Sequence, residues 1–191
     1  MPHQKIPKQM MAFSVVYDDA TPPSDSPIIR SVASLNVVRK NAKEARFSIT
    51  HEVYRSDNAT AEALTDMRIA IDPDDVILGY DDKSIAMPYN AAGDSMQRHR
   101  LALPMIGTAI CEGAILVTDD DGALQEIAQA YGLHVPAADD PLIRHMRLAA
   151  ERAQAIWLYW LWSCAEQPDR QYLASAYQAW SALERARPVP F

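Results

Sequence analysis

The stretch FSVVYDDAT, residues 13–21, decides the fold, because an apolar run ends there on two neighbouring acids. Its valines and aromatic residues favour a β-strand. Asp18 and Asp19 follow the strand directly. A buried strand that ends in carboxylates predicts a metal-dependent active site, since carboxylate oxygens are preferred ligands of Mg²⁺. Such a site usually needs a further acid at the position of Ala20.

Two more strand-like runs follow, at 28–40 and at 45–55, and the turn NAKE between them has the length of a hairpin loop. The first run alternates, with two sets of side chains on opposite faces: Val32, Ser34, Asn36 and Val38 on one, and Ser31, Ala33, Leu35 and Val37 on the other. We expect a strand that is covered more on one face than on the other. The opening of the chain therefore predicts three antiparallel strands.

The middle of the chain predicts two further strands that also end in acids. DDVILGYDD, residues 74–82, reads as a short buried strand beside the first one. GAILVTDDDG, residues 113–122, reads as another, with Asp121 as the N-cap of a helix that ends at Gly132.

Two helices are predicted at the end of the chain. Asp140 followed by Pro141 is a favourable helix start, with the acid at the N-cap and the proline at the first helical position. This helix runs to about residue 164, and we interpret its three tryptophans, at 157, 160 and 162, as core residues. The last helix carries one apolar stripe: Tyr172, Ala176, Ala179 and Leu183.

The composition is that of one globular domain. The chain has 191 residues, of which 49% are hydrophobic and 23% charged. We expect a flexible leader at 1–11, the domain at 12–165, and a C-terminal helix at 166–191 packed on it. The net charge of −7 restricts any nucleic-acid site to a local basic region.

Cysteine usage and hydropathy point to the cytoplasm. Cys111 and Cys164 form no pair with zinc-ligand spacing. The N-terminal residues lack the apolar core of a signal peptide, and AIWLYWLW at 155–162 is much shorter than the roughly 20 residues of a membrane helix. We therefore expect a cytoplasmic protein without a membrane partner.

Four stretches carry a resemblance to a known family: FSVVYDDAT with IIRSVASLNVV, VILGYDDKSIAMPY, ALQEIAQAYGLHVP and DPLIRHMRLAAERAQAIWLY. In this order they resemble the DnaQ-like (DEDD) 3'-5' exonucleases of the ribonuclease-H-like fold. The resemblance spans Phe13 to about Trp162. It implies an α/β protein with a ribonuclease-H-like mixed sheet, three leading antiparallel strands and flanking helices.

The resemblance also implies a catalytic set. In that family four carboxylates hold two Mg²⁺ or Mn²⁺ ions, which activate a water and stabilise the leaving oxygen. The matching positions are Asp18 and Asp82 as metal ligands, His145 as general base, and Glu151 as the late acid.

Two of the four expected carboxylates are missing from this set. Ala20 and Ala150 stand where the family has acids, and Glu151 lies one residue and about 100° further around the helix than the expected position. We expect at most one weakly held Mg²⁺ or Mn²⁺ ion.

We consider three functions, two from this resemblance and one from a rival fold. The first is a 3'-5' exonuclease-like domain that acts on or binds single-stranded nucleic acid, with two-metal catalysis weakened or lost. The second is a catalytically inactive module that binds a protein partner in a larger assembly. The third is a PIN-type nuclease, because GAILVTDDDGALQEIAQAYGLHV is also similar to that family; a PIN domain predicts a helix rather than a strand at 28–38.

Overall fold

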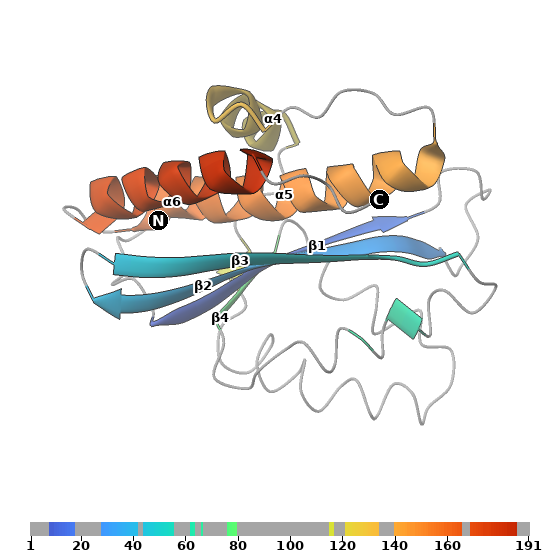
Figure 1. Cartoon of the computed structure of the whole chain (residues 1–191), viewed down its shortest axis with the longest axis horizontal. Coiled ribbons are helices and arrows are strands. Elements are labelled where there is room, and N and C mark those ends of the chain that lie inside the picture. Colours follow the sequence, from blue (N-terminus) through green and yellow to red (C-terminus); the bar gives the residue numbers. More distant parts are fainter. Residues whose placement is uncertain are drawn as a thin grey trace.

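The computed structural model describes the following residues: 8–17, 28–41, 44–55, 62–63, 66, 76–79, 115–116, 121–133, 140–165 and 169–186. They form an α/β structure in which helices cover a mixed β-sheet (Figure 1). The fold class predicted from the sequence, α/β with a mixed sheet and helices packed on it, is therefore confirmed.

The sheet has five strands in the order β3-β2-β1-β4-β5. The strands are β1 (Gln9–Tyr17), β2 (Ile29–Asn41), β3 (Glu44–Val53), β4 (Val76–Gly79) and β5 (Ile115–Leu116). β2 is antiparallel to β1 and to β3, whereas β4 is parallel to β1 and to β5. The order across the sheet differs from the order in the chain, because β1 lies inside the sheet and β3 at its edge.

β1 starts earlier than the sequence indicated. Met10 and Met11, assigned to the leader by the predicted boundary at residue 11, are each only 1% exposed. They point to opposite faces of the sheet, and both faces are covered at this position. The leader prediction was therefore too long by three residues, since the strand begins at Gln9.

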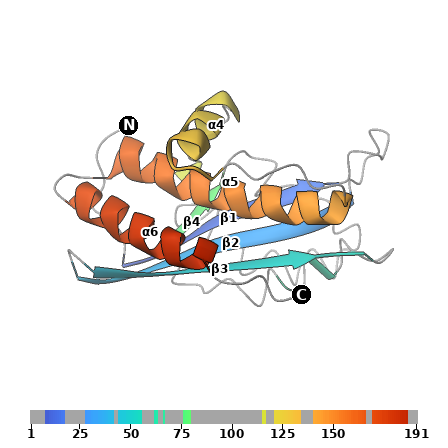
Figure 2. The same cartoon turned by 45° about the horizontal axis from the view of Figure 1, so that its top comes forward.

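Three helices lie on one face of the sheet: α4 (Asp121–Ala130), α5 (Pro141–Cys164) and α6 (Asp169–Ala186). α5 packs over β1 and β2, and α6 packs over the edge strand β3 (Figure 2). The larger core lies between these layers, with Leu35 of β2 and Trp157 of α5 fully buried.

β2 confirms the predicted alternation. Ala33, Leu35 and Val37 belong to the core under the helices, whereas Val32 belongs to a smaller core on the opposite face. On that second face the exposure rises toward the end of the strand, where Val38 is 38% exposed. Residues 29–38 thus lie in a strand, not in the helix that the PIN interpretation required over 28–38.

The start of α5 and the turn after α4 follow the predicted signals, whereas Asp121, predicted as an N-cap, is the first residue of α4 itself. Asp140 caps α5, since its carboxylate accepts a hydrogen bond of 2.8 Å from the amide of Leu142. After α4, Gly132 has a φ of 63°, which side chains disfavour, and the amide of Leu133 bonds back to the carbonyl of Ala128 at 2.8 Å.

The predicted stripe of α6 faces the core only at Ala176, which is partly buried and packs against it. The residues buried on α6 are Leu173, Ala174, Tyr177 and Ser181. Tyr172 is 46% exposed and Leu183 is 68% exposed. The reason is aromatic packing: the ring of Tyr177 lies 5.7 Å from Phe47 and 5.4 Å from Trp157, and this contact sets the rotation of the helix.

Candidate functional site

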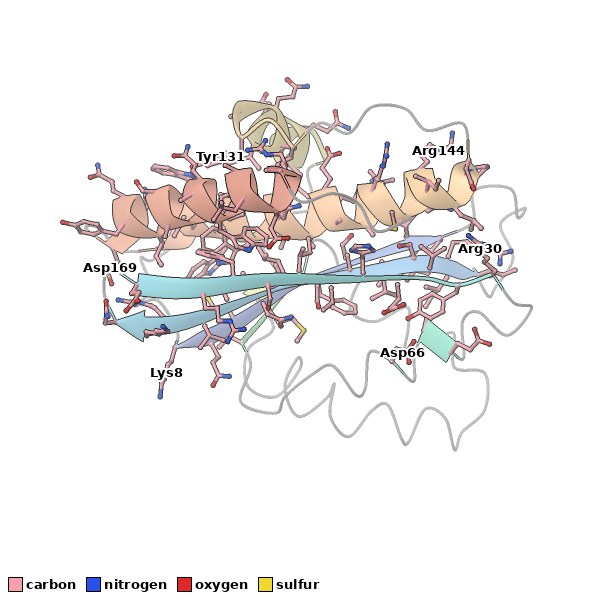
Figure 3. The ribbon with its side chains drawn as sticks, viewed as in Figure 1. Lys8, Arg30, Asp66, Tyr131, Arg144 and Asp169 are labelled. Carbon is pink, nitrogen blue, oxygen red and sulfur yellow. The ribbon has the colours of Figure 1, made fainter. Side chains whose placement is uncertain are left out.

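The carboxyl end of β1 and the start of α5 lie at the same end of the molecule (Figure 1). β1 runs toward Tyr17, its last residue, and Asp18 is the next residue in the chain. α5 runs in the opposite direction above β1. Arg144, in the first turn of α5, and Arg30, near the start of β2, mark this end of the molecule (Figure 3). The candidate site is therefore this end of the sheet.

Two of the predicted site residues, Asp18 and Asp82, lie outside the described residues. The structure therefore gives no position for the two predicted metal ligands. Within the described ranges, no group of three or more His, Cys, Asp or Glu residues is close enough to hold a metal ion.

His145 lies in the second turn of α5 and is buried, with 6% of its surface exposed. Neither of its ring nitrogens has a hydrogen-bond partner among the described residues. An imidazole acts as a general base only when it reaches the proton of a water or substrate. The burial of His145 therefore restricts this role to a state in which water gains access to the ring.

Glu151 does not share the face of His145. The two residues are six positions apart, which corresponds to a rotation of about 240° and a rise of about 9 Å along an α-helix. Glu151 is also only partly buried, unlike His145. Both residues lie on α5, but the structure does not bring their side chains to one side of the helix.

Ala150, where the family has an acid, is partly buried in α5. Its carbonyl accepts a hydrogen bond of 3.0 Å from the amide nitrogen of Gln154. The oxygen of the same Gln154 side chain accepts one of 2.8 Å from the hydroxyl of Tyr177. This part of α5 is thus tied to α6.

The tryptophans of α5 are mainly core residues, as predicted. Trp157 and Trp160 are fully buried. Trp162 differs, since it is 38% exposed; its indole nitrogen donates to the hydroxyl of Tyr131 at 2.7 Å, and the guanidinium of Arg170 lies 5.6 Å from its ring. These contacts join α4, α5 and α6.

Sequence reasoning missed a hydrogen-bonded polar pair on the face of the sheet opposite the helices. The hydroxyl of Tyr54 donates to the carboxylate of Asp66 at 3.0 Å. Burial of Tyr54 raises its pKa well above the ordinary value, and the hydrogen bond and charge of Asp66 raise it further. No motif marks this pair, because its two residues come from segments that only the fold brings together.

Comparison of the chain with protein-family models, with curated proteins and with solved structures found no match. No helix in the described ranges combines the length and apolar character needed to cross a membrane.

Proposed function

We propose that this chain is a ribonuclease-H-like domain of the 3'-5' exonuclease type that acts on or binds single-stranded nucleic acid, with two-metal catalysis weakened or lost. The observation that carries the proposal is the place of β1. It lies inside a mixed sheet between antiparallel β2 and parallel β4, and it ends beside the start of α5, at Tyr17 next to Asp18.

This arrangement supports a site at the end of β1. The proposed fold places its acids at the carboxyl end of the central strand and on the late helix. Here Asp18 follows β1 directly, and His145 lies in the second turn of α5. The sequence thus keeps one acid and one histidine at corresponding places.

The weakened catalysis rests on three features. The side chains of Ala20 and Ala150 supply no oxygen ligand. Mg²⁺ gives up its bound waters reluctantly, so an incomplete set of protein ligands holds it weakly. His145 is buried, with 6% of its surface exposed, and this burial limits its contact with an attacking water. Glu151 lies on another side of α5, so that it does not replace the acid missing at position 150.

A second function, an inactive module that binds a protein partner, is favoured by a specific observation. Two large hydrophobic side chains of α6 are exposed to solvent, Tyr172 at 46% and Leu183 at 68%. The PIN alternative is less favoured, because β2 occupies the residues where that fold predicts a helix.

The test combines metal binding with cleavage. The full chain is titrated with Mn²⁺ by calorimetry and incubated with 3'-labelled single-stranded DNA and RNA. We expect at most one weakly bound ion and slow or absent cleavage. Ala20→Glu combined with Ala150→Asp should raise the Mn²⁺ affinity at least about tenfold, because two hard oxygen ligands are added.

The matched control is Ala20→Gln with Ala150→Asn, which has similar volumes but no added charge and should leave the Mn²⁺ affinity unchanged. Rapid metal-dependent cleavage by the unmodified chain would contradict weakened catalysis. An unchanged affinity in the acidic double variant, together with no effect of Asp18→Asn, would remove the proposed site altogether.

A further inference from the structure

β3 forms an edge of the sheet that has no neighbouring strand among the described residues. It is ten residues long, from Glu44 to Val53, and contains neither proline nor glycine. One side of its backbone is paired with β2, and the register is regular from Ser31–Val53 to Arg39–Ala45. Such an edge offers unpaired amide and carbonyl groups to a further strand.

Charged side chains usually protect an edge strand from pairing. On β3 the exposed residues Arg46, Ser48, Thr50 and Glu52 alternate along the face that points away from the helices. Neither Arg46 nor Glu52 forms an ion pair with another described residue. Their positions are symmetric about Ile49, three residues before and three residues after it.

This symmetry makes β3 complementary to itself. If two copies of β3 pair in antiparallel order about a two-fold axis at Ile49, Arg46 of each copy lies directly opposite Glu52 of the other. Ser48 then lies opposite Thr50. Opposite charges at directly facing positions stabilise a strand pair, and two hydroxyl side chains can hydrogen-bond there.

Neighbouring registers lack this complementarity. An axis at Ser48 places Glu44 opposite Glu52, and like charges at facing positions are destabilising. Axes at Phe47 or Thr50 bring no opposite charges together. The charge pattern of β3 therefore selects one register, which a pattern that only protected the edge would not do.

We infer that a second copy of this chain binds to the β3 edge, antiparallel about a two-fold axis at Ile49, and extends the sheet across both subunits. Two-fold pairing of one surface with itself is the commonest form of a homodimer. In this arrangement the helices of both copies lie on the same face of the extended sheet, and α6 of one copy faces α6 of the other.

The predicted stripe of α6, in which Tyr172, Ala179 and Leu183 are exposed, fits the same arrangement. Trp180 stacks on Phe47 of β3 with 5.6 Å between the ring centroids, and α6 lies over this edge strand (Figure 2). The stripe has a symmetric order of sizes, since Tyr172 and Leu183 flank Ala176 and Ala179. In antiparallel helices each large residue then meets the other large residue, and the alanines allow close approach.

The position of α6 along β3 also agrees with a two-fold axis at Ile49. Tyr177, which lies between Ala176 and Ala179 in the sequence, and Trp180 both contact Phe47, which is two residues from the proposed axis. The contact between the two copies of α6 would therefore form close to the contact between the two copies of β3. A stable interface buries about 800 Å² per partner, and contact between the two copies of α6 would add to the area of the strand edge.

The experiment measures the mass of the full chain by sedimentation equilibrium over a range of concentrations. We expect a monomer–dimer equilibrium. Arg46→Glu and Glu52→Arg should each weaken dimerisation at least about tenfold, because each variant creates two like-charge pairs. The combined Arg46→Glu and Glu52→Arg variant should restore the dimer, because the opposite charges then exchange places.

Arg144→Glu is the matched control, since it reverses one exposed charge on α5, away from β3, and should leave the dimer unchanged. If the chain is monomeric at all concentrations, the inference is overturned, and the β3 edge would then be available to a strand of another protein. A dimer that tolerates both single reversals, or that the double variant does not restore, also overturns it.

Discussion

At the scale of single residues, His145 combines burial with a lack of partners. It is 6% exposed, and both ring nitrogens lack hydrogen bonds to the described residues. A buried polar group without partners costs about 1–3 kcal/mol of stability. Such a group is retained where it serves a function or where its shape fills the core. Replacing His145 by an apolar residue of similar volume distinguishes these two explanations.

We predict that His145→Leu leaves the chain as stable as before or stabilises it by about 1 kcal/mol in urea unfolding, because two unsatisfied nitrogens are removed at similar volume. His145→Gln is the control, since it keeps a polar group at this position and should bring no gain. If His145→Leu destabilises the fold by more than about 2 kcal/mol, the imidazole makes polar contacts that stabilise the folded chain.

At the scale of elements, features that depend on local sequence could be predicted, whereas contacts between distant side chains could not. The alternation in β2 identified the buried face because successive side chains of a strand point to opposite sides. Asp140 and Pro141 identified the start of α5 because capping is a local interaction. These features depend on residues close together in the sequence.

The face of α6 could not be predicted in this way. The helix carries apolar residues on two sides: Leu173 and Tyr177 on one, Tyr172 and Leu183 on the other. Contacts with Phe47, which is far away in the sequence, decide which side is buried. The burial of His145 likewise depends on how closely α5 packs on the sheet. Local sequence therefore determines neither the buried face of α6 nor the burial of His145.

The cap of α5 permits an energetic test. Asp140→Ala should destabilise the chain by about 1 kcal/mol, because the amide of Leu142 loses its acceptor at 2.8 Å. Asp140→Asn keeps a side-chain oxygen and should cost little. Glu126→Ala, at an exposed position within α4, should change stability by less than about 0.5 kcal/mol. Equal urea midpoints for Asp140→Ala and Glu126→Ala would show that the cap does not stabilise α5.

At the scale of the whole molecule, each of the two cores contains a buried tyrosine with a raised pKa. Tyr177 lies in the core under the helices and Tyr54 in the core on the opposite face. Burial is the largest cause for both residues. At Tyr177 the hydrogen bond with Ser181 and the charge of Arg185 lower the pKa and offset part of this effect.

These shifts predict loss of stability at alkaline pH. In the unfolded chain a tyrosine ionises near about pH 10, whereas in the folded chain both hydroxyls keep their protons to higher pH. Above about pH 10 the unfolded state therefore binds fewer protons than the folded state, and the free energy of unfolding falls as the pH rises. Below about pH 9 the two tyrosines contribute no slope.

We predict that Tyr177→Phe and Tyr54→Phe each make the free energy of unfolding less dependent on pH between about pH 9.5 and about pH 11, and that the double variant reduces the slope further. Each variant also loses a hydrogen bond, to Gln154 or to Asp66, which lowers stability by about 1 kcal/mol at all pH values and leaves the slope as the informative quantity. The measurement is urea unfolding at several pH values, with Tyr172→Phe, at an exposed position of α6, as the control. If the double variant keeps the full alkaline slope, ionisation of these two buried hydroxyls does not limit the stability of the fold.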